Sequence, residues 1–94
     1  MAVKITVSVT ENKNTDNKIV SLDISLQGSY ETESGPVTST INETYTFTEP
    51  KDEVTVSEKY KIVAEILKNN VNSIISSIKT QTGLDNLGET IVAM

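Results

Sequence analysis

The stretch "TSTINETYTFT", residues 38–48, places a threonine at nearly every second position. Threonine occupies positions 38, 40, 44, 46 and 48, Asn42 fills the one gap, and Ile41, Tyr45 and Phe47 fall in the alternate set. Residues two apart in a strand point to the same side of a sheet. The stretch therefore predicts a strand whose hydroxyl-rich side faces solvent and whose other side meets a core, with β-branched threonine favouring the extended backbone.

Two earlier segments alternate in the same way. Val3, Ile5, Val7 and Val9 interleave with Lys4, Thr6, Ser8 and Thr10, and Val20, Leu22, Ile24 and Leu26 interleave with Ser21, Asp23, Ser25 and Gln27. The turn-rich runs "ENKNTDNK" (11–18) and "GSYETESGP" (28–36) separate the three segments. This order predicts an antiparallel three-stranded meander with one apolar face.

A helix is expected after the third strand. Thr55 and Glu58 have the spacing of a capping box, and apolar residues recur at intervals of three and four from Tyr60 to Ile78. Gly83 is a suitable helix stop. The fold class is therefore α+β, with one long C-terminal helix packed on one face of the meander.

We expect a single domain over residues 1–94. Its sheet covers residues 1–48, its connector 49–56 and its helix 57–82. Residues 83–94 contain a short turn and then either a fourth, edge strand or a free tail. Along the helix the apolar stripe changes direction at Asn69 and Asn70, so either the helix breaks there or its apolar face is unusually wide.

The residue types that are absent exclude much chemistry. The chain has no Cys, His or Trp, and all eight basic residues are Lys, so it has no Arg either. It therefore lacks a thiolate nucleophile, an imidazole base, the usual ligands of zinc and the bidentate guanidinium group. We expect a protein that is not an enzyme and that needs no metal or cofactor.

One weak metal pattern has a simpler explanation. Asn12, Asn14, Asp16 and Asp23 match some ligand positions of a calcium-binding loop. Asn17 stands where such loops have glycine, and the flanking segments are predicted strands instead of helices. A polar hairpin loop that uses Asn and Asp to tolerate left-handed backbone explains the same residues.

The charge is negative and unevenly distributed. The net charge is −5 and the pI is about 4.6; residues 1–56 hold four Lys and nine acidic residues, whereas residues 57–94 are balanced. This charge argues against nucleic acid and anionic membranes and favours a neutral or basic protein partner. The candidate partner-binding residues are Glu31, Glu33, Glu49, Asp52 and Glu53.

The composition favours a binding function. The first hypothesis is a small cytoplasmic protein that acts by stoichiometric protein contact. It would be encoded by a phage or mobile element, and it would inhibit or adapt a host protein in the host cytoplasm. The start of the chain has a strand pattern without the apolar run of a secretory signal. Lys without Arg, beside abundant Asn and Ile, is typical of AT-rich genomes.

Two alternatives stay open. The first is a self-assembling structural subunit, of a virion or tail for example, whose self-interface would use surplus helical isoleucines. The candidates are Ile62, Ile66, Ile75 and Ile78. The second alternative is a small-molecule binding domain built on Glu43, which is a candidate functional acid because it interrupts the apolar side of the third strand beside Tyr45.

Overall fold

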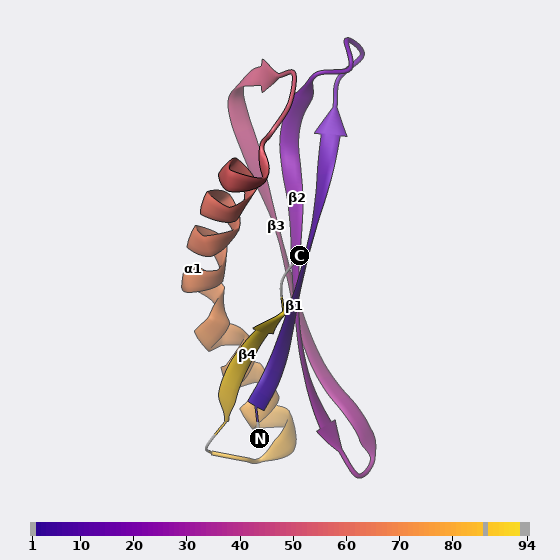
Figure 1. The fold of residues 1–94 in the computed structure, drawn as a ribbon. Coiled ribbons are helices and arrows are strands. Elements are labelled where there is room, and N and C mark those ends of the chain that lie inside the picture. The colour runs from indigo at the N-terminus through magenta and orange to yellow at the C-terminus, as the bar shows by residue number, and fades with distance from the viewer. Residues whose placement is uncertain (1, 86, 93–94) are drawn as a thin grey trace.

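The computed structural model describes residues 2–85 and 87–92 (Figure 1). Three long strands, β1 (Ala2–Lys13), β2 (Ile19–Thr32) and β3 (Gly35–Lys51), precede the helix α1 (Val56–Thr82) and a short strand, β4 (Gly88–Val92). The strand order is β3-β2-β1-β4; β2 is antiparallel to both neighbours, and β4 is parallel to β1. The predicted α+β fold, a three-stranded meander with a long helix on one face, is confirmed.

The C-terminal residues form a strand as far as the structure describes them. β4 pairs with the first part of β1, from Ala2 opposite Gly88 to Thr6 opposite Val92. It therefore extends the meander by a fourth strand at the edge, which was one of the two alternatives. Asn86, Ala93 and Met94 lie outside the described residues.

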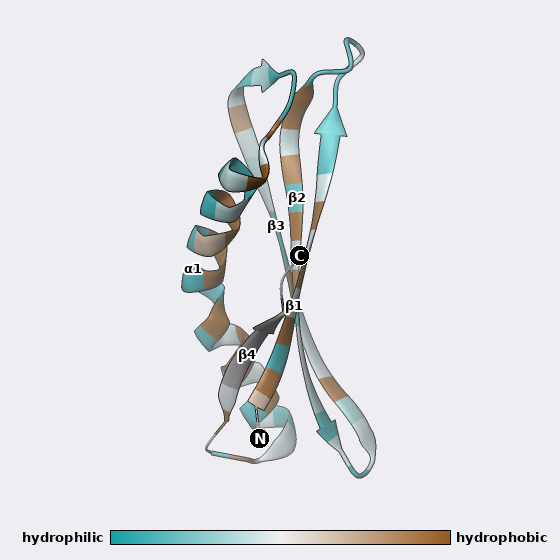
Figure 2. Cartoon of the chain, viewed as in Figure 1, coloured by the Kyte–Doolittle hydropathy of each residue, from teal (hydrophilic) through white to brown (hydrophobic). Residues whose placement is uncertain are grey.

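The core lies between one face of the sheet and α1. Apolar positions, brown in Figure 2, recur along the strands and the helix. Strand β2 lies between β1 and β3, and its residues Leu22, Ile24 and Leu26 are at most 1% exposed. The other buried residues are Val3, Ile5, Val7, Ile19, Val54, Val63, Ile74, Ile75 and Ile78. Among the described residues no polar or charged side chain is buried. Hydrophobic burial is therefore the main stabilising contribution of this interior.

A β-bulge changes the predicted inward face of β2. Val20 was expected in the core, but Ile19 is buried there and Val20 is only half-buried. Asn12 pairs with Ser21 and Lys13 with Ile19, so Val20 is one extra residue in β2. A bulge moves every residue beyond it to the opposite face. The alternation therefore predicted the strand correctly but assigned the wrong residue to the core at its start.

The predicted Thr55 cap and Gly83 stop are confirmed, and the helix begins at Val56, one residue before the expected start at 57. The Thr55 hydroxyl accepts a hydrogen bond from the Glu58 N–H at 3.1 Å, which satisfies one free amide of the first turn. Gly83 ends α1 in a left-handed conformation with a φ of 74°, and its N–H donates to the Lys79 carbonyl at 2.7 Å.

The helix is continuous through Asn69 and Asn70. Of the two alternatives, the unbroken helix with a wide apolar face is therefore correct. The residues Val63, Ile74, Ile75 and Ile78 are buried, whereas Ile62, Ile66, Leu67 and Val71 are partly buried. Within residues 2–85 and 87–92, no helix combines the length and apolarity needed to cross a membrane.

Gly28 allows the helix to approach the sheet closely. A Cβ atom at this position of β2 would lie 2.3 Å from Cγ2 of Ile74 and 3.2 Å from Cδ1 of Ile78. It would also lie 3.2 Å from Cγ1 of Val3. Both isoleucines are fully buried, so neither has free space to move into. The absence of a side chain at Gly28 therefore sets the distance between α1 and β2.

Substitution of Gly28 by alanine should destabilise the fold. Overpacking of a filled core costs roughly 1–3 kcal/mol, and urea unfolding followed by circular dichroism would measure the loss. Gly88→Ala is the matched control, because a Cβ atom there meets nothing within 4 Å. Equal stability of the two variants would show that the helix does not press on Gly28.

Candidate functional site

Strand β3 is at the edge of the sheet. Its strand partner is β2, and within the described ranges no other strand pairs with it. None of its 17 residues is buried. An edge strand presents unpaired N–H and C=O groups that another chain can bind. We call the outer side of Val37–Thr48 the β3 edge, and it is the first part of the candidate site.

One contact shows which backbone groups of β3 point outward. The Gln81 side-chain amide, near the end of α1, donates to the Thr38 carbonyl at 3.2 Å. This contact indicates that the Thr38 carbonyl points away from β2. Alternate residues of an antiparallel strand direct both backbone groups to the same side. The outward groups therefore belong to Thr38 and the even-numbered residues that follow it, including Thr40, Asn42 and Thr44.

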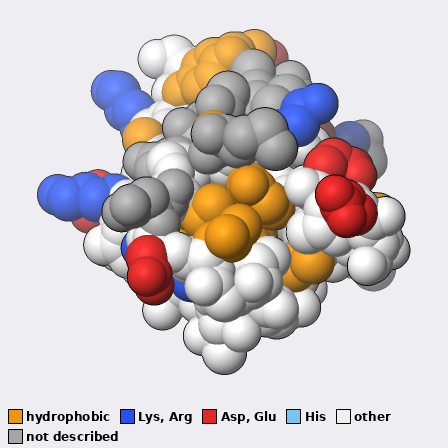
Figure 3. Space-filling view, turned by 90° about the horizontal axis from the view of Figure 1, so that it is seen from below, with side chains coloured by type: hydrophobic (Ala, Val, Ile, Leu, Met, Phe, Trp, Pro, Cys, Tyr) orange, Lys and Arg blue, Asp and Glu red, His pale blue; other side chains and the backbone are white. Residues whose placement is uncertain are grey.

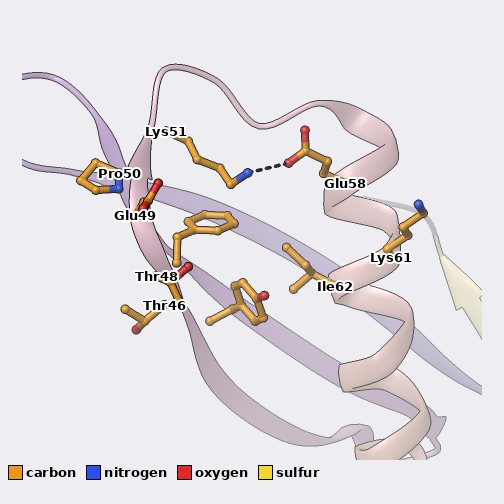
Figure 4. Close-up of a pocket in the computed structure, with 10 residues that line it drawn as sticks. Thr46, Thr48, Glu49, Pro50, Lys51, Glu58, Lys61 and Ile62 are labelled. Carbon is orange, nitrogen blue, oxygen red and sulfur yellow. Dashed lines mark ion pairs between the residues drawn. The ribbon is translucent and has the colours of Figure 1, made fainter.

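An open groove of about 630 Å³ lies beside the end of β3 and is the second part of the site (Figure 4). The aromatic rings of Tyr45 and Phe47 line one wall, edge to face, with centroids 5.2 Å apart and an interplanar angle of 73°. Ile62, on α1, lines the opposite wall. Tyr45 is 43% exposed, so the groove has aromatic surface open to solvent.

Charged residues stand at the upper end of the groove. Nζ of Lys51 lies 5.4 Å from the centroid of the Phe47 ring and 3.5 Å from a carboxylate oxygen of Glu58 (Figure 4). Desolvation, the largest single influence, raises the pKa of Glu58. Hydrogen bonds donated by Thr55 and the charge of Lys51 lower it by more in total, so the pKa lies below its ordinary value.

Glu43 does not join the groove. It is exposed on β3, where its carboxylate accepts a hydrogen bond from the Asn70 amide of α1, and it is not among the groove-lining residues. The same amide also donates to the Ile66 carbonyl at 2.7 Å. The structure therefore places Glu43 at a contact between helix and strand, whereas Tyr45 lies in the groove near Lys51 and Lys61. A role of Glu43 as a functional acid stays a prediction.

The five acidic candidates fall into two separate groups. Glu31 and Glu33 lie at the β2–β3 turn, whereas Glu49, Asp52 and Glu53 lie at the other end of β3 and in the connector, in a molecule 49 Å long (Figure 1). Asp52 is paired with Lys18. Viewed from the end with the turn, charged side chains of both signs are scattered around a small hydrophobic area (Figure 3). The five residues thus form no single acidic surface, and their role in binding stays a prediction.

The four isoleucine candidates differ in exposure. Ile75 and Ile78 are 8% and 0% exposed, so in this structure they belong to the chain's own core. Ile62 and Ile66 are half-buried. A self-interface of the folded chain, which stays a prediction, would therefore use Ile62 and Ile66.

The uncovered face of the sheet carries the threonine row. All five threonines, together with Asn42, are exposed, as the alternation predicted. The Thr44 hydroxyl donates to the Asp23 carboxylate at 2.7 Å across to β2. This bond, with a smaller contribution from Asn12, lowers the pKa of Asp23 below its ordinary value. Short polar side chains thus stabilise the face opposite α1.

Polar groups of the loop with the calcium-like pattern form hydrogen bonds within the loop. The Asn14 side-chain oxygen accepts hydrogen bonds from the N–H groups of Asp16 and Lys18, both at 3.0 Å. Asn17 has a φ of 62°, which is the left-handed backbone expected of a polar hairpin loop. In the part of the chain that the structure describes, no three His, Cys, Asp or Glu side chains are arranged to hold a metal ion.

The groove is the feature that the sequence analysis missed. The signal was available, because Tyr45 and Phe47 share one side of β3 and only a short connector separates β3 from α1. A short connector places the first helical turns beside the end of the preceding strand. Phe47, Lys51 and Ile62 were therefore predictable neighbours, but the edge position of β3 depends on which strand pairs with which.

Comparisons with known proteins add no family or function. No protein-family model, no curated protein and no solved structure matched the chain. The geometry of the chain itself is therefore the basis for a function.

The ion pair at the groove can be tested by titration. Because the pKa of Glu58 is lowered in the folded chain, its ionised form stabilises the fold, and this contribution is lost as the pH falls through that pKa. Lys51→Met should raise the pKa of Glu58, measured by carboxyl NMR titration. Lys61→Met is the control, because Lys61 lines the same groove and forms no ion pair with any described residue. Equal effects of both variants would contradict the specific pair.

Proposed function

We propose that this chain is a small, acidic, non-catalytic binding protein that acts by stoichiometric protein contact through the β3 edge. The observation that supports this most directly is the 17-residue outer strand β3, which among the described strands pairs with β2 alone. Natural proteins usually protect such an edge by making it short, charged or covered. β3 is long, and Glu43 is the only charged residue between Gly35 and Thr48.

The contact mode that fits this surface is strand addition. An extended segment of the partner would hydrogen-bond to the outward groups of β3, and side chains of that segment would enter pockets beside the strand. The groove lined by Tyr45, Phe47 and Ile62 lies where such a side chain would be received. Backbone pairing would supply affinity, and the aromatic groove would supply selectivity for an apolar side chain.

The charge narrows the class of partner. A net charge of −5 favours a neutral or basic protein. We place this contact in the cytoplasm, where the protein would inhibit or adapt a host protein as the product of a phage or mobile element. Small-molecule binding is less well supported, because Glu43 lies outside the aromatic groove and lines a smaller open hollow of about 290 Å³ beside Asp23 and Asn42.

A self-assembling structural subunit is the second candidate function. Ile62 and Ile66 are half-buried on the side of α1 that follows β3. Pairing of two copies would cover this apolar surface and the β3 edge together. The two candidates thus share one contact surface and differ in the partner.

A proline at an outward-facing residue of β3 tests this surface. Thr40→Pro removes an N–H that points away from β2 and should abolish the complex while the chain stays folded. Native mass spectrometry of the protein purified gently from its host would show the loss as a monomer mass. Thr40→Ala is the matched control, because it removes the same side chain and keeps the N–H.

The comparison of these two variants decides the proposal. Circular dichroism melting should show that both fold. A partner mass retained by Thr40→Pro would contradict contact through the β3 edge, and a monomer from the unmodified protein at every concentration would contradict stoichiometric contact altogether.

A further inference from the structure

The outward-facing part of β3 is symmetric about Asn42. Thr38 and Thr46 lie four positions to either side of it, and Thr40 and Thr44 lie two positions to either side. All five side chains are exposed on the uncovered face. If a second copy of β3 ran antiparallel with Asn42 opposite Asn42, every threonine of this set would face a threonine. Cross-strand pairs of threonine are favourable in antiparallel sheets.

The side of β3 that faces the helix is complementary in the same register. Val37 of one copy would face Phe47 of the other, and Ser39 would face Tyr45. Val37 and Phe47 are half-buried in the single chain, and Tyr45 is 43% exposed. The pairing would therefore remove aromatic surface of the groove from water.

The charge of Glu43 fits this register better than one centred on Glu43 itself. A pairing centred on Glu43 would place that carboxylate directly opposite its own copy, which is unfavourable. Centred on Asn42, Glu43 faces Ile41.

The regular part of β3 limits the other registers. Its pairing with β2 is regular from Gly35 to Thr46 and shifts before Lys51. Pro36 has no N–H to offer, so the outward-facing residues that can pair regularly run from Thr38 to Thr46. Asn42 is the centre of that range.

The helix leaves room beside the junction. Asn70 contacts Glu43 and Gln81 contacts Thr38, so this side of α1 follows the β3 edge. Its intervening residues Ser73 and Ser77 are short. In the pair, Gln81 would release the Thr38 carbonyl to the Thr46 N–H of the second copy.

We propose that the partner at the β3 edge is a second copy of this chain, with the two β3 strands antiparallel and Asn42 on the two-fold axis. This inference rests on the proposed contact through the β3 edge and names its occupant, so it favours the second candidate function, self-assembly, over contact with a host protein. The dimer would contain one continuous sheet across the junction, with both copies of α1 on the same side.

A single cysteine on the axis tests the register, because the chain has no cysteine of its own. Opposed Cα atoms of a hydrogen-bonded pair are about 5.5 Å apart, which is within the range that a disulfide spans. When Asn42→Cys is oxidised at a protein concentration at which the dimer forms, most of the protein should become a covalent species of twice the 10.2 kDa mass of one chain. Non-reducing electrophoresis and mass spectrometry would measure the conversion.

Three further variants control this result. Thr40→Cys or Thr44→Cys alone should form no disulfide cross-link, since equivalent residues of the paired copies would lie about 14 Å apart. A mixture of Thr40→Cys and Thr44→Cys should cross-link, because these residues face each other in the proposed register. The mixture also tests the pairing without any change at Asn42. Thr10→Cys, exposed on the same face but on β1, measures cross-linking by random collision.

The outcomes separate this inference from the proposed function. Cross-linking of Asn42→Cys at the level of Thr10→Cys, together with no cross-linking in the mixture, would overturn the self-pairing. Efficient cross-linking of Thr44→Cys alone would overturn the register. If native mass spectrometry shows a different protein bound to the unmodified chain and to Thr40→Ala but not to Thr40→Pro, the self-pairing is overturned. Contact through the β3 edge would then still hold.

Discussion

The packing of one helix against one face of the sheet determines the rest of the structure. Ile74 and Ile78 of α1 press on Gly28 of β2, where any side chain would collide with them. One helix covers one face only, so the opposite face must be polar, and it carries the rows of Ser, Thr and Asn. The β3 edge lies outside this packed contact, and none of the β3 residues is buried. The candidate site is therefore found at this edge.

Two local features fix the groove. The Thr55 cap begins α1 only a few residues after β3 ends, so the first helical turns stand beside Tyr45 and Phe47. The shift in pairing between Thr46 and Lys51 turns the end of β3 away from its regular path along β2. Together they open a space between strand and helix in place of continuous core.

Much of the fold followed from periodicity, because each strand has one apolar side and the helix ends carry a cap and a glycine. The core position of Ile19 did not follow, because a bulge is a property of strand pairing. The site was less predictable for the same reason. Tyr45 and Phe47 could be assigned to one side of β3, but their exposure depends on β3 being an outer strand, and the grouping of Glu31 and Glu33 away from Glu49 depends on the length of the hairpin.

Amide hydrogen exchange along β3, followed by NMR, tests the central claim most directly. In dilute solution the amides of Ile41, Glu43 and Tyr45, which pair with β2, should exchange slowly, whereas those of Thr40, Asn42 and Thr44 should exchange fast. The second set alone should gain protection as the protein concentration rises and copies pair. Equal protection of both sets of amides in the dilute monomer would contradict a free β3 edge. A difference in protection between the two sets that stays the same at all concentrations and with any partner would contradict the use of this edge as the contact surface.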